Sequence, residues 1–162
     1  MAKPDKSNEK TNVMRLLDQA DIAYTPHWYD AALTSGTEVA AALGQSAECV
    51  FKTLVAEANT GEHFVFVIPS PETLSLKKAA KAAGVKSVAM LPQKKLLPLT
   101  GYIHGGCSPV GMKKPFPTWI DETALLTDAF FCSAGRVGAQ LEIDPEALAG
   151  YIGAEFADLT EE

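Results

Sequence analysis

The sequence predicts one α+β domain, in which a mixed β-sheet is flanked by helices. At 162 residues the chain is long enough for a single domain with a real core. Hydrophobic residues make up 47% of it and charged residues 21%, a balance typical of a globular protein. Helical and strand-like patterns intermix along the chain without regular β-α-β alternation, which favours the α+β class.

Two early stretches have the pattern of helices. From Asn12 to Tyr24, apolar side chains recur at helical spacing. Ser35, with Glu38 three residues later, has the form of a capping box, and Gly44 is a stop signal for the same helix. Further helices are expected at 74–84, at 92–99 where Pro92 opens a short one, and at 145–152 after Asp144.

Strands are expected between these helices. Two β-rich runs within 50–69 surround Asn59-Thr60-Gly61, a signal for a hairpin. A second strand–turn–strand unit is expected at 129–143, with its turn at Gly135–Gly138. Shorter strands are expected at 88–90 and 117–121.

The two ends of the chain are expected to lie outside the domain. We expect a disordered leader at 1–9, the domain at 10–155 and an acidic tail at 156–162. The longest apolar runs, such as Phe64–Ile68, are strand-sized and too short to cross a bilayer. The first residues are polar and lack an apolar signal core, so a cytoplasmic protein is expected.

Cysteine and histidine usage gives no sign of a disulfide framework or a metal site. The three cysteines are scattered and include no C-x-x-C pair, which is typical of reduced thiols. His27, His63 and His104 lack the spacing of metal ligands. We therefore expect neither a metal nor a cofactor.

Charge is distributed unevenly along the chain. The net charge is −6, but residues 73–120 carry eight lysines and no Asp or Glu, a local charge of +8. Residues 1–72 carry −5 and residues 121–162 carry −9. A basic central third is the pattern expected of a protein that binds a phosphate backbone, although solvated lysines spread over separate helices would give the same count.

Lys52 is the best-placed charged residue. On a strand, Val50, Lys52 and Leu54 share one face, while Phe51 and Val55 lie on the other. A lysine between apolar neighbours either extends its ammonium group to solvent or points into a cleft. In a cleft it could bind phosphate or orient a carbonyl group.

The loop 105–111 has the composition of a backbone binding loop or of a tight structural turn. Ser108 resembles the serine of a G-x-S-x-G elbow, but Val110 replaces the second glycine and no partner histidine or acid is marked. A nucleophilic serine is therefore disfavoured. Gly105 and Gly106 permit unusual backbone angles and close approach, so the loop could direct N–H groups at a carbonyl oxygen or phosphate.

Three further residues are weaker candidates. Cys107 lies near Lys113 and Lys114, which could lower the pKa of its thiol, but no catalytic histidine is evident, and a space-filling role is favoured. Arg136, in the serine–glycine turn 133–138, either faces the same cleft or closes a hairpin. Gln140, on the following strand, is a possible polar residue of the cleft.

Together these motifs resemble a known family. The segments "KTNVMRLLDQADIAY", "VFKTLV", "TGYIHGGCSPVGMKK", "WIDE" and "SAGRVGAQLEI" occur in the order and spacing of YbaK-type proteins, free-standing relatives of the editing domain of bacterial prolyl-tRNA synthetase. The resemblance extends from Lys10 to about Ile152. Two positions depart from it: Cys107 stands where the family commonly has an apolar residue, and Trp119 replaces a smaller one.

The resemblance implies a mixed, barrel-like sheet flanked by helices and a trans-editing hydrolase of Cys-tRNA(Pro), in which the thiol of the substrate attacks its own ester. It implies catalytic roles for Lys52 and Gly106. It also implies that the substrate is bound by Thr53, Gly105, Ser108, Pro109, Gly111, Ser133 and Gly135, to which the residue pattern adds Gln140.

The expected partners are tRNA(Pro) mischarged with cysteine and prolyl-tRNA synthetase, with a monomer as the default state. The candidates for contact with the tRNA backbone are Lys77, Lys78, Lys81, Lys94, Lys95, Lys113, Lys114 and Arg136. Two alternatives stay open: a deacylase of Ala-tRNA(Pro) or another small misacylated residue, and a non-catalytic module that binds tRNA or protein.

Overall fold

The fold is described from a computed structural model, for residues 9–33 and 35–162. Over these described residues, eight strands form two sheets, one of three strands in the order β1-β7-β6 and one of five in the order β4-β2-β3-β5-β8. The strands are β1 (Tyr24–Trp28), β2 (Phe51–Ala58), β3 (His63–Pro69), β4 (Val88–Met90), β5 (Thr118–Asp121), β6 (Phe130–Ser133), β7 (Ala139–Ile143) and β8 (Glu155–Ala157). The helices are α1 (Asn12–Gln19), α2 (Gly36–Ala42), η2 (Ala47–Cys49), α3 (Leu76–Ala83), η3 (Gln93–Lys95), α4 (Leu96–Thr100), η4 (Glu122–Leu126) and α5 (Pro145–Ile152).

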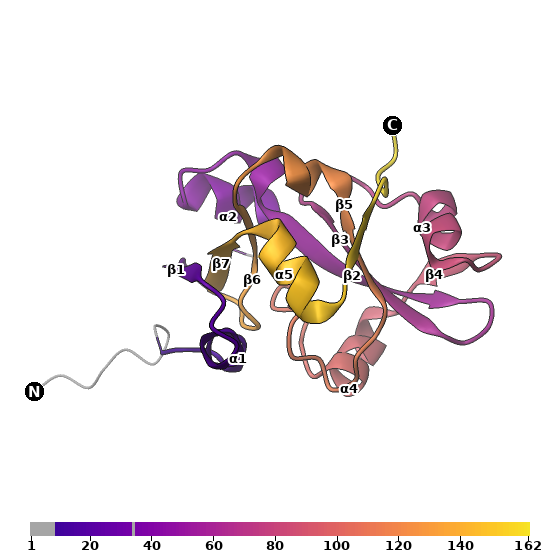
Figure 1. The fold of residues 1–162 in the computed structure, drawn as a ribbon, viewed down its shortest axis with the longest axis horizontal. Coiled ribbons are helices and arrows are strands. Elements are labelled where there is room, and N and C mark those ends of the chain that lie inside the picture. The colour runs from indigo at the N-terminus through magenta and orange to yellow at the C-terminus, as the bar shows by residue number, and fades with distance from the viewer. Residues whose placement is uncertain (1–8, 34) are drawn as a thin grey trace, which may run out of the picture.

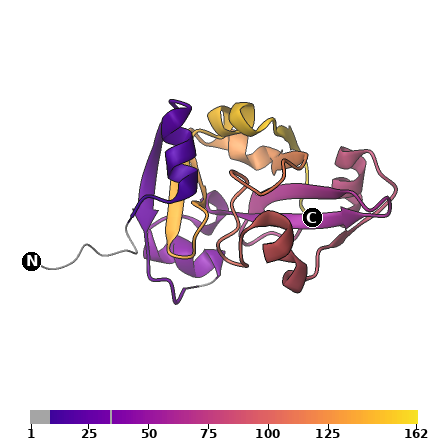
Figure 2. The ribbon, with the colours of Figure 1, turned by 90° about the horizontal axis from the view of Figure 1, so that it is seen from below.

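The expected α+β class and the mixed sheet are confirmed. The three-stranded sheet is antiparallel, whereas the larger sheet combines antiparallel pairs with the parallel pairs β3–β5 and β5–β8. The barrel-like closure is not observed: over the described residues the strands form two sheets joined at one isolated parallel bridge between Val50 and Phe131. In Figures 1 and 2, α1, α2 and the smaller sheet lie at one end of the molecule, with α3 and β4 at the other.

One edge of β2 contacts strands of both sheets. On one edge, β2 pairs with β3 along its whole length. On the other edge, Val50, the residue before β2, forms a bridge with β6, and Ala56–Ala58 of β2 pairs with β4. The five residues Phe51–Val55 lie between these contacts, so Lys52, Thr53 and Leu54 lie where β6 and β4 diverge.

Two cores lie on opposite faces of the β2–β3 hairpin, as the alternation of side chains dictates. Phe51 and Val55 face a core shared with α1, α5 and the smaller sheet. Leu54 and Ala56 face a second core, which α3 closes with Ala79 and Ala80. This division leaves Lys52 on the α3 side of the sheet and Thr53 on the opposite side.

Most of the expected elements are confirmed, with two strands missed. Ser35 caps α2, accepting a hydrogen bond from the Glu38 amide at 3.2 Å. The first helix ends at Gln19, earlier than the pattern indicated, because Asp21 takes a positive φ and redirects the chain. The missed strands are β1, an edge strand whose Pro26 obscured the pattern, and the three-residue β8.

The C-terminal residues belong to the packed structure. Leu159 is fully buried in the core beside α3, and its amide donates to the buried carboxylate of Asp121 at 3.0 Å. The boundary expected at residue 155 therefore falls inside β8, and the packed domain continues beyond it. At the other end, the expected leader lies, except for Glu9, outside the described residues.

No helix among the described residues is long and apolar enough to cross a membrane. Nor does any group of three His, Cys, Asp or Glu side chains in residues 9–33 and 35–162 have the arrangement of a metal site.

The packing of the C-terminal segment can be tested by shortening the side chain of Leu159. We expect Leu159→Ala to lower the free energy of unfolding by about 2–5 kcal/mol, because it removes a fully buried side chain. Glu161→Ala, at an exposed position in the same segment, should change it by less than about 0.5 kcal/mol. Urea denaturation measures both, and equal small effects would contradict a packed C-terminal segment.

Candidate functional site

A cavity of about 290 Å³ lies beside β2, where β6 and β4 diverge. Its walls come from β2, the start of α2, the loop after α4, and the strands β6 and β7. Its lining comprises Tyr29, Ser35, Gly36, Val39, Val50, Phe51, Lys52, Thr53, Leu54, Ser70, Leu96, His104, Gly105, Cys107, Ser133 and Gln140. Segments far apart in the sequence thus converge on one small, partly apolar space.

Lys52 contributes a cation to this cavity. Its side chain is half-buried, and desolvation lowers the pKa of its ammonium group, while the carboxylate of Glu72 acts in the opposite direction. Within the part of the chain that the structure describes, Lys52 forms no ion pair. Because its folded pKa is lowered, holding Lys52 charged near neutral pH costs stability, and this cost disappears as pH rises through the folded pKa toward the ordinary value of 10.5.

Two polar atoms in the cavity wall are buried without a hydrogen-bond partner in the described protein. They are Oγ1 of Thr53 and Oε1 of Gln140. A buried polar atom without a partner costs about 1–3 kcal/mol, so such atoms are rare in folded proteins and indicate a place for a ligand. Gln140 Oε1 can only accept a hydrogen bond, whereas the Thr53 hydroxyl can accept or donate one.

The loop after α4 closes one side of the cavity with its backbone. Gly105 has a φ of +88°, a conformation that glycine adopts at little cost. The N–H of Gly106 donates to the Ile103 carbonyl at 3.0 Å and is therefore occupied within the loop. The N–H groups of Gly105 and Cys107 form no hydrogen bond within the described residues, and both residues line the cavity.

Gly106 has a spatial role in this loop. A Cβ atom at this position would lie 3.0 Å from the Val137 nitrogen and 3.2 Å from the Arg136 carbonyl carbon. The absence of a side chain at residue 106 lets the loop approach the β6–β7 turn this closely, and a Cβ there would require a shift of a few tenths of an ångström. Gly106 thus fixes where its neighbours present their N–H groups.

Ser108, Pro109 and Gly111 lie outside the cavity lining. Ser108 is fully buried, and its Oγ accepts the Val110 N–H at 3.2 Å, so it stabilises the turn. Gly111 has a φ of +75° and packs near Tyr102. These residues shape the loop rather than line the cavity.

The end of β6 contributes Ser133 to the cavity. Its Oγ accepts the Gly135 N–H at 3.1 Å, which leaves the hydroxyl proton available to a ligand. Gly135 lies outside the lining, at φ +94° against Val13. Arg136 packs over the Trp28 ring, with its guanidinium carbon 5.4 Å from the ring centroid.

The Cys107 thiol is a poor nucleophile in this setting. Burial raises its pKa to about 12, so the group stays protonated near neutral pH. The described cavity contains no serine–histidine or cysteine–histidine hydrogen bond. The groups that it offers to a ligand include one cation, two unpaired polar oxygens, the Ser133 hydroxyl and the backbone N–H groups of Gly105 and Cys107.

The sequence reasoning missed the wall that the N-terminal part of the chain supplies. Tyr29 follows β1, and Gly36 begins α2 directly against Ser70. A Cβ atom at Gly36 would lie 2.0 Å from the Ser70 Oγ, so glycine is required for this contact. Among the signals in the sequence, only the Ser35 cap marked this region, and a cap predicts a helix rather than a site.

The lysines expected on the tRNA backbone are dispersed over the surface. Lys94 and Lys95 lie on η3, Lys113 and Lys114 on the loop before β5, and Lys77 and Lys81 on α3, all of them exposed. Lys78 is half-buried and pairs with Asp158, with 3.0 Å between Nζ and Oδ2. None of them lines the cavity itself.

Comparison with known proteins decides the family. The family model for the aminoacyl-tRNA editing domain matches residues 30–151, which include the whole cavity lining except Tyr29. The chain belongs to the aminoacyl-tRNA editing domain family. It is therefore an enzyme of the aminoacyl-tRNA deacylase class.

Relatives of this editing domain agree in length and fold. A protein of Enterococcus faecalis (strain ATCC 700802 / V583), named as a candidate Cys-tRNA(Pro)/Cys-tRNA(Cys) deacylase, EbsC, is 45% identical over 158 residues, 96% of each chain. The crystal structure of a candidate trans-editing enzyme for prolyl-tRNA synthetase superposes with a TM-score of 0.78 at 27% identity, covering 86% of this chain and 87% of that one. The hypothetical protein APE2540 gives a TM-score of 0.85 at 28% identity, covering 92% and 99%.

The position of the Gly105–Cys107 segment is testable by adding one methyl group. We expect Gly106→Ala to lower the single-turnover deacylation rate by about 10–100-fold, because its Cβ would push the loop away from the Arg136–Val137 backbone. The matched control is Gly150→Ala on α5, where an added Cβ meets nothing within 4 Å. Equal rates for both variants would contradict the positioning role, and circular dichroism verifies that both are folded.

Proposed function

We propose that this editing domain hydrolyses cysteinyl-tRNA(Pro), with the thiol of the substrate as the nucleophile. One observation carries the proposal: the cavity gathers groups that bind and polarise an aminoacyl ester, but among the described residues no serine or cysteine in it is hydrogen-bonded to a histidine. An ester is already activated, so positioning and stabilisation of the oxyanion can supply much of its rate of cleavage.

The groups of the cavity have complementary roles toward such a substrate. The Lys52 ammonium binds the phosphate of the terminal nucleotide, an anion that satisfies an otherwise unpaired cation. Thr53 Oγ1 and Gln140 Oε1 accept hydrogen bonds from the α-ammonium group and a ribose hydroxyl. The free N–H groups of Gly105 and Cys107 donate to the ester carbonyl oxygen as negative charge develops on it.

In the proposed reaction, the sulfur of the cysteinyl group attacks its own carbonyl carbon. The bond from that carbon to the ribose oxygen breaks, and the thiol proton passes to the ribose oxygen. The products are free tRNA and a cyclic thioester of cysteine, which water then hydrolyses to the amino acid. The protein holds the reactive pose and stabilises the oxyanion, and no protein atom becomes covalently bonded.

The size of the cavity supports a small aminoacyl group. At about 290 Å³ it lies at the lower end of the range for ligand pockets. The relatives support the cysteinyl ester and prolyl-tRNA synthetase as partner, since one is named for Cys-tRNA(Pro) and Cys-tRNA(Cys) and another for trans-editing with that synthetase. We place this activity in the cytoplasm.

The proposal is tested by single-turnover deacylation of Cys-tRNA(Pro) and Ala-tRNA(Pro). We expect the wild-type protein to cleave the cysteinyl ester at least about 100-fold faster, because the alanyl group has no thiol to attack its ester. Lys52→Ala should lower the rate on Cys-tRNA(Pro) by at least about 100-fold, whereas Lys10→Ala, at an exposed surface ion pair, should leave it unchanged.

Two outcomes would contradict this assignment. Faster cleavage of the alanyl ester would move the protein to a deacylase for another small misacylated residue. Binding of tRNA without cleavage of either ester would identify a non-catalytic binding module.

A further inference from the structure

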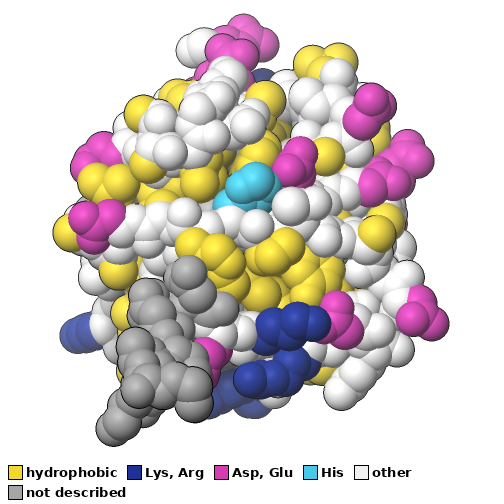
Figure 3. Space-filling model, turned by 90° about the vertical axis from the view of Figure 1, so that its left-hand side faces the viewer, with side chains coloured by type: hydrophobic (Ala, Val, Ile, Leu, Met, Phe, Trp, Pro, Cys, Tyr) yellow, Lys and Arg dark blue, Asp and Glu magenta, His cyan; other side chains and the backbone are white. Residues whose placement is uncertain are grey.

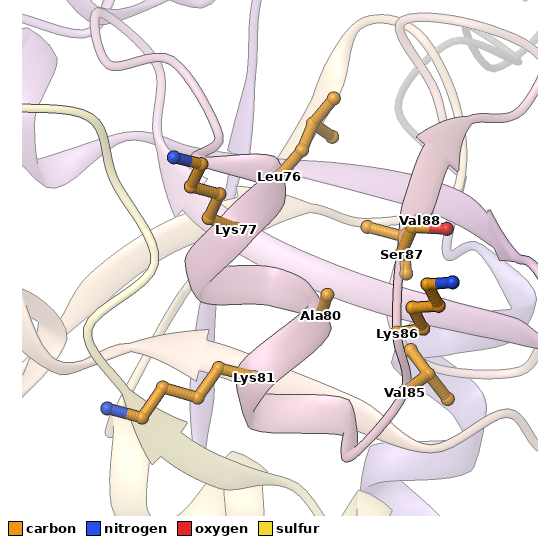
Figure 4. Close-up of a pocket in the computed structure, with 8 residues that line it drawn as sticks. All are labelled: Leu76, Lys77, Ala80, Lys81, Val85, Lys86, Ser87 and Val88. Atoms are coloured by element: carbon orange, nitrogen blue, oxygen red, sulfur yellow. The ribbon is translucent and has the colours of Figure 1, made fainter.

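A second concave surface lies between α3 and the start of β4. This α3–β4 groove, of about 330 Å³, is lined by Leu76, Lys77, Ala80, Lys81 and the segment 85–88. Figure 4 shows Lys77 and Lys81, one helical turn apart, projecting from the same side of α3, with Lys86 across the groove on the segment that leads to β4. The rest of the lining is mostly apolar, and all of the charged side chains that line the groove are basic.

The three lysines of the groove are exposed and, within the described residues, form no ion pair. Lys78, on the same helix, differs because Asp158 binds its ammonium group. The groove lysines also belong to the segment 73–120, which contains no acidic residue. Figure 3 shows the opposite end of the molecule, where acidic side chains are scattered and a group of Lys and Arg side chains lies below an apolar patch.

The groove lies on the same side of the larger sheet as Lys52. Leu54 and Ala56 follow Lys52 on that face of β2, and α3 packs on the same face through Ala79 and Ala80. β4 pairs with β2 at Ala56–Ala58, four to six residues further along the strand than Lys52, and the groove residue Val88 pairs with Ala58. At about 3.3 Å a residue, Val88 of the groove lies roughly 20 Å from Lys52 along the strand.

We propose that the α3–β4 groove binds the phosphate backbone of the acceptor stem of the tRNA whose 3′ end enters the cavity. A separation of about 20 Å corresponds to about six stacked nucleotides at ~3.4 Å each, enough for the unpaired 3′ end and the first paired nucleotides. Lys77 and Lys81 contact phosphates on one side of the groove and Lys86 on the other. Such contacts supply affinity independent of nucleotide sequence and orient the stem relative to the cavity.

This inference rests on the proposed function, since it takes a tRNA 3′ end as the occupant of the cavity. Equilibrium binding of uncharged tRNA(Pro) at several salt concentrations tests it independently of catalysis. For Lys77→Gln/Lys81→Gln we expect at least about tenfold weaker binding near 0.1 M salt and a salt slope reduced by about 1.5, because two phosphate contacts are lost. The matched control, Lys10→Gln/Arg15→Gln, removes two positive charges at the α1 end and should have a much smaller effect.

Deacylation of two substrates separates this inference from the proposed function. The α3 variant should raise KM for Cys-tRNA(Pro) but cleave the cysteinyl ester of the trinucleotide CCA, which has no stem, as the wild type does. Equal tRNA binding by the α3 variant and the wild type would overturn the groove assignment, as would equal weakening by the control. Groove-dependent tRNA binding without cleavage by the wild type would overturn the proposed function alone.

Discussion

The site depends on one constraint: one edge of β2 is contacted by two different strands, which diverge from each other. β2 is paired along its whole length with β3, but its other edge is shared between β6 at one end and β4 at the other. Where these two strands diverge, Lys52 and Thr53 meet a space instead of a neighbouring strand. The loop after α4 and the start of α2 then close this space into a cavity. A fully paired edge would leave no room for a substrate beside β2.

The cavity is stabilised by its surroundings rather than by its own groups. Lys52 is partly desolvated without an ion pair in the described protein, and two wall oxygens lack hydrogen-bond partners there. Each of these features opposes folding, so the two cores on either face of the β2–β3 hairpin must offset them. The same arrangement prepares the site, because groups without internal partners are free to bind a substrate without first breaking other contacts.

The local elements of this fold could be predicted from the sequence because their signals are local. The Ser35 cap, the hairpin turn at Asn59-Thr60-Gly61 and the alternation along β2 each depend on neighbouring residues. The strands β1 and β8 were missed, since one contains a proline and the other has only three residues whose stability comes from pairing with β5. Their existence depends on partners distant in the sequence.

The site could be predicted in part. Lys52, Thr53, Gly105, Ser133 and Gln140 were expected and do line one cavity, but the resemblance to a family, rather than periodicity, united them. Gly36 was missed because its role arises only when α2 packs against Ser70 after β3, and Tyr29 because it follows β1, a strand that was not expected. The occupied N–H of Gly106 and the free N–H groups on either side of it follow from the loop conformation, which composition does not determine.

The most direct test of this account is an NMR titration with 3′-cysteinylamino-3′-deoxyadenosine, in which an amide replaces the cleavable ester. We expect saturable shifts of the Gly105 and Cys107 backbone N–H signals and of the Gln140 side-chain amide, because these groups bind the aminoacyl end directly. Saturable shifts confined to residues outside the cavity, with these three signals unchanged, would contradict the assignment of the site.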